Sequence, residues 1–208
     1  MTTIKDKEGN SYRTIEIGNQ TWMLDNLKVT SLSNGQPMTL LNSDKEWSAA
    51  NSMAYCYCNG DNDTFSNYGV LYNGYVIQNF KEICIDGWRV PTINDWQVLI
   101  NHLGNDKAGK LMKAGCFDFW LNNKYQEEEV QTDKFFSYPS GERAGYGSYS
   151  NHNNSAVYWS SDHASSAFGV DTGAFKTILL TPPMPWGDKA TESESTLKAG
   201  ASIRLIKI

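Results

Sequence analysis

The three histidines, His102, His152 and His163, are the side chains of this chain best suited to acid–base catalysis near neutral pH. A serine hydrolase would also need a nucleophile turn such as Gly-x-Ser-x-Gly, and a zinc hydrolase would need His-Glu-x-x-His, but the sequence contains neither. It also lacks a glycine-rich phosphate-binding loop. His102 falls in a stretch with helical spacing, where a solvent-facing or partly packed histidine is the simpler interpretation. The pattern therefore favours a protein that is not an enzyme.

The four cysteines, Cys56, Cys58, Cys84 and Cys116, are the other residues that could bind a metal or form disulfides. Only Tyr57 separates Cys56 from Cys58, whereas structural zinc sites usually place about two to four residues between paired ligands. The spacing is also not that of a disulfide scaffold, and a chain of 208 residues does not need one. We therefore expect structural or free thiols, no metal and no cofactor.

Asn59-Gly60-Asp61-Asn62-Asp63 is a cluster of oxygen ligands that Ca²⁺ could use. No acidic residue closes the cluster at the place that a twelve-residue calcium loop requires. A polar turn is favoured on composition, and calcium binding by Asp61 and Asp63 stays an open alternative.

The segment Gly145–Ser166 has the composition of a binding surface. Fifteen of its 22 residues are Gly, Ser, Asn or Tyr, two of the three histidines lie in it, and it contains no Lys, Arg or Glu. Tyrosine supplies contact area at low entropic cost, while Ser, Gly and Asn supply adaptable hydrogen bonds, as in antibody paratopes. An ordinary surface loop shares much of this composition, so both interpretations stay open. Some of its aromatic residues must be core, and Trp159 is the best candidate.

Composition and charge exclude several classes of protein. The net charge of −5 argues against nucleic acid as the main partner, because phosphate binding needs a basic surface. No run approaches the roughly 18 apolar residues that a membrane span needs. The first residues hold no apolar stretch typical of a signal peptide, so either the protein stays where it is made or a leader has been removed. The length suits a single domain over residues 1–208, with 26 aromatic residues (Trp 7, Tyr 11, Phe 8) available for its core.

Helices are predicted early in the chain and short strands late. Residues 12–23 read as a hairpin that turns at Gly18-Asn19 and buries Trp22. A short helix follows Asn42-Ser43, a second begins at Thr92 with a Thr92/Asp95 capping box, and a third covers 106–114. The later strands are predicted at 117–120, 135–136, 156–159, 168–170, 177–180 and 203–208. Together these elements indicate one α+β domain.

Five segments, in this order, resemble one known family. They are Gly18–Leu27 (GNQTWMLDNL), Tyr68–Tyr72 (YGVLY), Cys84–Thr92 (CIDGWRVPT), Tyr158–Ser161 (YWSS) and Gly200–Arg204 (GASIR). They resemble the landmarks of the Fibrobacter succinogenes major paralogous domain over almost the whole chain. The resemblance implies a C-type-lectin-like fold with two main helices, small twisted antiparallel sheets, long loops and termini brought together as adjacent strands.

The sequence departs from the family pattern in two places. In secreted members a cysteine often follows the final arginine and pairs with the cysteine before Gly-Trp-Arg, but here Leu205 stands there and Cys84 lacks that partner. This weakens the case for an oxidising compartment. Ile85-Asp86 replaces the usual Pro-x, which leaves the turn before Gly87 less rigid.

Some relatives with this fold are variable proteins of diversity-generating retroelements, and Gly145–Phe168 resembles their diversified region in position and composition. The resemblance implies a non-enzymatic module that binds a protein or glycan ligand at the cell surface or outside the cell, or alternatively on a phage tail fibre. The oligomeric state is open. The residues expected to contact the ligand are Tyr146, Ser148, Tyr149, Asn151, His152, Asn153, Asn154, Ser160, Asp162 and His163.

Three alternatives to this function stay open. The first is a surface-exposed paralogous lipoprotein domain that binds glycans. The second is a relative of the formylglycine-generating enzymes, which need reactive cysteines in the C-terminal half, where this chain has none after Cys116. The third is a Ca²⁺-dependent lectin, although the Glu-Pro-Asn and Trp-Asn-Asp sugar motifs are absent.

Overall fold

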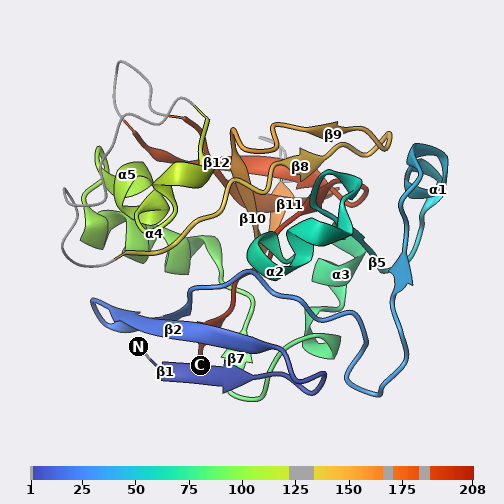
Figure 1. The fold of residues 1–208 in the computed structure, drawn as a ribbon, viewed down its shortest axis with the longest axis horizontal. Helices are drawn as coiled ribbons and strands as arrows, with labels where there is room; N and C mark the ends of the chain where they lie inside the picture. The colour runs from blue at the N-terminus through green and yellow to red at the C-terminus, as the bar shows by residue number, and fades with distance from the viewer. Residues whose placement is uncertain (1, 122–133, 166–170, 183–187) are drawn as a thin grey trace.

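Three sheets organise the part of the protein that the computed structural model describes, which is residues 2–121, 134–165, 171–182 and 188–208 (Figure 1). Their strand orders are β1-β2-β3-β14-β7, β4-β5-β6-β13-β8-β9 and β10-β11-β12. All neighbouring strands run antiparallel except β4 and β5. With the helices on the flanks of the sheets, this is an α+β architecture, as the sequence predicted.

The five-stranded sheet joins both ends of the chain. It contains β1 (Thr2–Lys5), β2 (Ser11–Ile17), β3 (Gln20–Met23), β7 (Trp88–Arg89) and β14 (Ile206–Lys207). The predicted hairpin is confirmed as β2 and β3, and Gly18 at the turn has a φ of 60°, which favours glycine. Trp22 is fully buried, as expected, and pairs with Ile206 of β14.

The six-stranded sheet collects short strands from distant parts of the chain. It contains β4 (Thr39–Leu40), β5 (Ala54–Tyr57), β6 (Val70–Asn73), β8 (Glu142–Arg143), β9 (Tyr149–Ser150) and β13 (Gly200–Ala201). The strand β13 lies between β6 and β8, so the C-terminal segment ties the first half of the chain to the β8–β9 hairpin.

The three-stranded sheet has longer strands and lies above β1, β2 and β7 in the view of Figure 1. It contains β10 (Ala156–Ser165), β11 (Asp171–Leu180) and β12 (Ala190–Thr196). The predicted strands 156–159 and 177–180 are therefore confirmed as parts of longer strands. The predicted strand at 168–170 lies outside the described residues.

The helices are short except for one. They are α1 (Asp44–Ala49), α2 (Phe65–Tyr68), α3 (Gly74–Gln78), α4 (Ile93–Leu103) and α5 (Ala108–Lys113). Ser43 caps α1, and Thr92 and Asp95 form the capping box of α4, both as predicted. Short 3-10 turns cover Cys58–Gly60, Asn62–Thr64, Phe80–Glu82 and Phe117–Phe119.

Two predicted strands are wrong. The apolar run at 117–120 forms a 3-10 turn over Phe117–Phe119, in which Phe117 is buried and Phe119 is exposed. The indole of the following residue, Trp120, is buried and donates to the carbonyl of Ser137. Phe135 and Phe136 lie in an irregular segment, and Phe136 has a φ of 55°. Their carbonyls accept hydrogen bonds from the buried guanidinium of Arg204. The side chain of Arg204 therefore takes the place that a neighbouring strand would have as hydrogen-bond donor. A short apolar run predicts burial better than it predicts the type of element.

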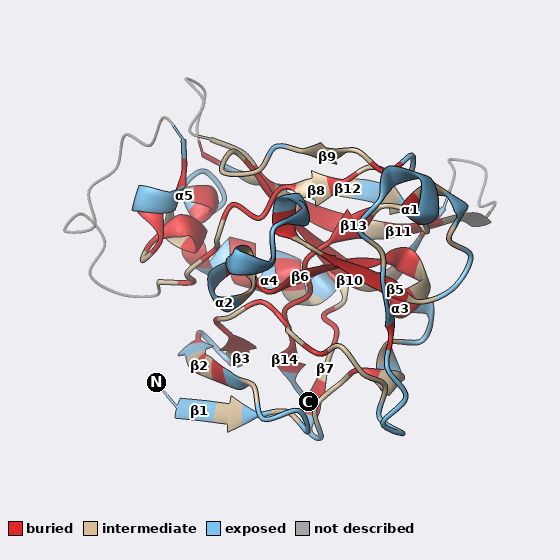
Figure 2. Cartoon of the chain, turned by 45° about the vertical axis from the view of Figure 1, so that its right-hand side comes forward, coloured by how far each residue is buried: buried red, intermediate tan, exposed pale blue. Residues whose placement is uncertain are grey.

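The buried residues gather on the inner strands and helices (Figure 2), and many of the largest are aromatic. The ring of Trp96 on α4 stacks against Trp22 with a centroid distance of 4.6 Å and against Tyr158 with one of 5.5 Å. A second cluster contains Tyr72 and Trp159. The expected burial of Trp22 and Trp159 is therefore confirmed, and Trp88 and Trp96 are buried as well. Within the described residues, no helix is both long enough and apolar enough to cross a bilayer.

Candidate functional site

The β8–β9 hairpin is held in place from beneath by Arg143. This side chain is fully buried, and its guanidinium donates to the carbonyls of Gly147 (2.6 Å), Leu41 (2.5 Å) and Asn42 (3.0 Å). The same group lies 4.5 Å from the ring of Trp47 and 4.4 Å from the ring of Tyr149. A buried guanidinium bonded to carbonyls and stacked between aromatic rings fixes the hairpin relative to the chain before α1.

The loop that follows β9 is fixed by bonds to three other segments. Asn151 and Asn153 have φ values of 60° and 61°, a conformation that asparagine tolerates better than most residues. The backbone of Asn153 accepts from Leu121 N (2.7 Å) and donates to Pro139 O (2.9 Å). Its side-chain oxygen accepts from the hydroxyl of Tyr68 (2.8 Å). The loop is therefore ordered independently of any ligand.

An aromatic cluster lies against this loop. The ring of Tyr68 contacts His152, Tyr138 and Phe119, with centroid distances of 5.1, 5.5 and 6.2 Å. Burial lowers the pKa of His152 and raises the pKa of Tyr68 to about 12, so both rings are neutral at pH 7. Phe119 and Leu121 keep 38% and 54% of their area exposed, which gives the loop an apolar margin.

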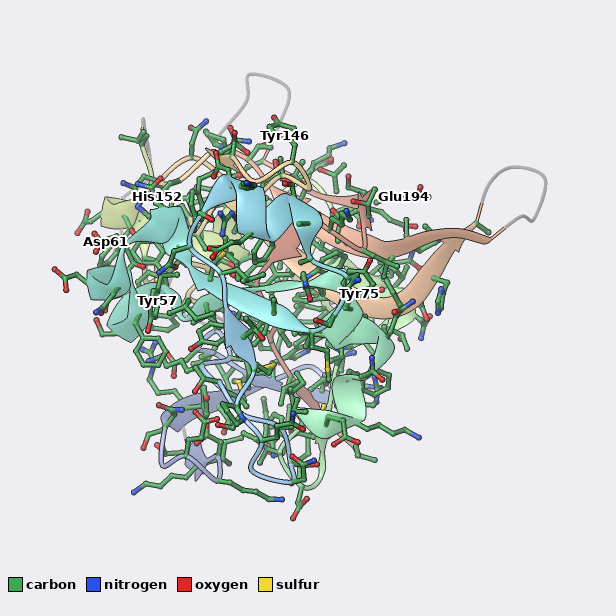
Figure 3. All side chains as sticks on the ribbon, turned by 90° about the vertical axis from the view of Figure 1, so that its right-hand side faces the viewer. Tyr57, Asp61, Tyr75, Tyr146, His152 and Glu194 are labelled. Carbon is green, nitrogen blue, oxygen red and sulfur yellow. The ribbon has the colours of Figure 1, made fainter. Side chains whose placement is uncertain are left out.

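We call Tyr146, Ser148, Tyr149, Asn151, His152, Asn153 and Asn154 the hairpin surface, because these predicted residues are contiguous on the hairpin and its following loop. Tyr146 is 74% exposed and Asn151 is exposed, while the other five are half-buried. Figure 3 shows Tyr146 at one end of the molecule, with His152 and Asp61 to one side and Glu194 to the other. The structure thus brings seven of the ten predicted residues together.

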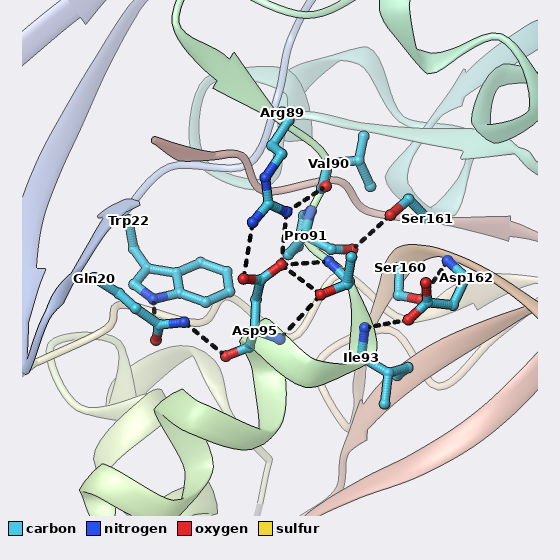
Figure 4. A network of polar contacts seen from close by, with 11 residues as sticks. Gln20, Trp22, Arg89, Val90, Pro91, Ile93, Asp95, Ser160, Ser161 and Asp162 are labelled. Atoms are coloured by element: carbon cyan, nitrogen blue, oxygen red, sulfur yellow. Dashed lines mark hydrogen bonds and ion pairs between the residues drawn. The ribbon is translucent and has the colours of Figure 1, made fainter. Parts of the chain in front are cut away.

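The other three predicted residues, Ser160, Asp162 and His163, lie further along β10 (Figure 4 shows the first two). Ser160 is fully buried and its hydroxyl accepts from the backbone of Asp162, so its predicted exposure to a ligand is wrong. A carboxylate oxygen of Asp162 accepts from Ile93 N (2.7 Å) at the start of α4. His163 is exposed and its ring packs 4.3 Å from that of Phe175. These residues are separated from the hairpin surface for two reasons. Successive side chains of β10 point to opposite faces of the sheet, and Asp162 is bonded to the start of α4.

Asp61 and Asp63 lie in the polar turn that their composition favoured. A carboxylate oxygen of Asp61 accepts from the backbone of Asp63 (2.9 Å), which caps a 3-10 turn. In the described part of the chain, no three His, Cys, Asp or Glu residues are grouped so that they could hold a metal ion. His102, the remaining histidine, is exposed on α4 beside Gly18.

The cysteines are free thiols, and three of them have a pKa raised by burial. The pKa of Cys84 is raised to about 11, and Leu205, which replaces the family's partner cysteine, is itself buried. Because the thiolate is the reactive form, these thiols are poor nucleophiles at pH 7.

Several residues beside the hairpin surface carry no signal in the sequence that would mark them as part of a site. Tyr68, Phe119 and Tyr138 come from three segments, and only the tertiary fold brings their rings together. Glu142 was overlooked because it precedes the polar segment, although its pairing with Ser150 places it beside Asn151.

Comparison with known proteins identifies the family. Among curated proteins and among solved structures, nothing matches the chain. The family model described as the Fibrobacter succinogenes major domain matches residues 15–207. The resemblance read from the five sequence segments is therefore confirmed, and the chain belongs to the Fibrobacter succinogenes major domain family.

Proposed function

We propose that this protein is a non-enzymatic binding module whose ligand contacts the hairpin surface. The observation that carries the proposal is the combination of a rigidly held backbone with exposed tyrosine and polar side chains. A surface ordered before binding loses little conformational entropy when a ligand binds. Tyrosine, asparagine and serine are the side chains that paratopes use for contact area and hydrogen bonds.

The titratable groups of this region support binding rather than catalysis. Burial raises the pKa values of Cys56 and Tyr149 and lowers that of His152, so each group stays neutral at pH 7. A relative of the formylglycine-generating enzymes would need a thiol with a lowered pKa, which is the opposite of what burial does to Cys84.

The finer fold assignment, a C-type-lectin-like domain, is part of the same proposal. Two features support it: the N-terminal hairpin and the C-terminal strand β14 share one sheet, and α4 packs its tryptophan against that sheet. The protein or glycan nature of the ligand, a location at the cell surface or on a phage tail fibre, and diversification by a retroelement stay predictions from the family resemblance.

Binding assays on two surface variants test the proposal. The full chain is screened on a glycan array and against a phage-displayed library of folded proteins. Any hit is then titrated against Tyr146→Ala/Ser148→Ala and against His152→Ala. We expect at least one variant to weaken binding by about tenfold or more, because truncating an interface tyrosine commonly costs over 1 kcal/mol.

The matched control is Tyr75→Ala/Gln78→Ala on α3, which removes a half-buried tyrosine and a polar side chain elsewhere. Circular dichroism and thermal unfolding establish that each variant folds. If the hits bind both hairpin-surface variants as tightly as the control, the hairpin surface is not the binding site and the proposal is wrong.

A further inference from the structure

A small cleft separates the hairpin surface from the three-stranded sheet. It has a volume of about 210 Å³. Glu142, Asn151 and Asn154 line one wall, and residues of β10, β11 and β12 line the floor, among them Val157, Thr177 and Ser193. The register places Thr177 opposite Ser193 and Trp159, so the floor is the face of the sheet that carries alternate residues of each strand.

Two hydroxyls in this cleft are buried without a hydrogen-bond partner among the described residues. They belong to Ser155, which is 4% exposed, and to Thr177, which is fully buried. A buried hydroxyl that makes no hydrogen bond destabilises the folded state, so native proteins keep few of them. Two such groups in one cleft indicate that a polar ligand completes their hydrogen bonds.

The lining determines which chemical class fits. The charged residues that line the cleft are Glu142 and Glu194, and none of the described lining residues is Lys, Arg or His. Glu194 pairs with Lys176, on the opposite face of the sheet from Thr177 and Ser193, so Glu142 is the carboxylate that faces the cleft. A carboxylate without a neighbouring cation repels phosphate, sulfate and carboxylate ligands. The amides of Asn151 and Asn154 have N–H donors as well as oxygen acceptors, and one donor of Asn151 is already bonded to Glu142. The remaining donors favour a ligand that also accepts hydrogen bonds, which an ammonium or guanidinium group cannot do.

We infer that the cleft binds one uncharged sugar unit, such as the terminal residue of a glycan. Sugar hydroxyls both donate and accept, as the serine, threonine and asparagine side chains of the cleft require. Val157 and Leu179 provide an apolar part of the floor for the C–H face of the ring. The volume lies below the approximately 300–1,000 Å³ of sites for drug-sized ligands, which suits a single ring. The inference rests on the proposed function in that Asn151 and Asn154 belong to both sites.

The inference is tested by titrating small molecules into the ¹⁵N-labelled full chain and monitoring the chemical shifts of its backbone amides. The probes are glucose, galactose, mannose and N-acetylglucosamine, with inorganic phosphate and methylammonium as probes of the competing charge classes. We expect millimolar binding of at least one neutral sugar, with shifts concentrated at the amides of Ser155, Thr177 and Ser193. Thr177→Val should weaken this binding by about fivefold, the loss expected for one hydrogen bond.

Thr191→Val, on the neighbouring strand and outside the cleft, is the matched control and should leave sugar affinity unchanged. The inference is overturned if no neutral sugar shifts the cleft amides, or if phosphate or methylammonium binds there instead. It is also overturned if a sugar binds but Thr177→Val has no effect. Tyr146→Ala/Ser148→Ala separates the two proposals, because it tests the hairpin surface and leaves every residue of the cleft intact.

Discussion

The hydroxyl of Thr177 lowers the stability of the folded protein at the cleft where we propose that a ligand binds. This residue lies in β11 with no exposed area, and its hydroxyl has no hydrogen-bond partner among the described residues. Valine has nearly the same shape without the hydroxyl, so it would fill the same space without an unsatisfied polar atom. Residues at binding sites commonly carry such a cost, which replacement by an apolar residue removes.

We predict that Thr177→Val raises the free energy of unfolding by about 1 kcal/mol. Urea denaturation followed by tryptophan fluorescence measures the change. Thr14→Val is the contrasting control, because the equally buried hydroxyl of Thr14 is 2.6 Å from that of Thr2 and its loss should destabilise the protein. A lower stability of Thr177→Val would show that its hydroxyl is already satisfied in the free protein.

His152 makes stability depend on pH. Burial against Tyr68 lowers its pKa below the ordinary 6.5, so the unfolded chain binds a proton at a higher pH than the folded protein does. Proton binding therefore stabilises the unfolded state relative to the folded state as the pH falls below 6.5, and the free energy of unfolding decreases until the folded protein is protonated as well.

The predicted result is a decrease in the free energy of unfolding between pH 7 and about pH 5, which His152→Gln reduces. Urea titrations at intervals across this range measure it. Asp25 and Asp95 have lowered pKa values and contribute only at more acidic pH, so they do not obscure the effect. The assignment to His152 fails if His152→Gln shows the same decrease as the unaltered chain.

At the scale of elements, Asp162 connects a strand to a helix. Its carboxylate accepts from the backbone of Ile93, as Figure 4 shows. Thr92 and Asp95 accept from each other's backbone N–H groups at the same end of α4. Arg89 of β7 in turn pairs with Asp95 at 2.6 Å. The start of α4 is therefore the point where β7, α4 and β10 are fixed to one another.

Asp162→Ala should lower the free energy of unfolding by about 1 kcal/mol, the usual cost of losing a helix N-cap acceptor. Ligand binding by the hairpin surface should not change, because Asp162 lies at the other end of β10. Asp162→Asn keeps an acceptor oxygen and should recover most of the stability. Thermal unfolding together with the binding assay checks this; a loss of affinity in correctly folded Asp162→Ala would restore Asp162 to the ligand-binding set.

Sequence signals between neighbouring residues predicted an element correctly where neighbouring residues alone determine its structure. The capping box at Thr92 and the turn at Gly18 depend on neighbouring residues, and both are found as expected. The segments at 117–120 and 135–136 are shaped by distant partners, since Arg204 takes the carbonyls of Phe135 and Phe136. The same distinction holds for the candidate site. The hairpin surface is contiguous in the sequence, so its composition could predict it. The cleft could not be predicted, because strand pairing brings Glu142, Ser155 and Thr177 together from distant positions.

At the scale of the whole molecule, the last residues of the sequence hold the two halves together. β13 pairs with both β6 and β8, and β14 pairs with both β3 and β7. Arg204 between them is fully buried and donates to the side chain of Asn26 (2.9 Å) and to the carbonyls of Phe135 and Phe136. The segment that contains β13, Arg204 and β14 is thus central to two sheets.

A chain that stops at Ser202 should therefore fail to fold cooperatively. It would lose β14 from the middle of the five-stranded sheet and leave the partners of Arg204 unsatisfied. Dispersion of the amide spectrum and the sharpness of the urea transition report the result. A chain that stops at Ile206 removes only Lys207 and Ile208, both exposed, and should retain most of the stability. Cooperative unfolding of the shorter chain would show that the N-terminal hairpin folds without its C-terminal partner.

Arg143 also affects how freely this protein can change through evolution. Its guanidinium bonds reach backbone carbonyls at Leu41, Asn42 and Gly147, and a backbone carbonyl is present whatever the side chain is. Under the proposed function, substitutions at Tyr146 or Ser148 would therefore alter ligand recognition while leaving the anchor of the hairpin unchanged. Mutational tolerance is built into this segment, so descendants of one sequence could acquire different specificities without first compensating for lost stability.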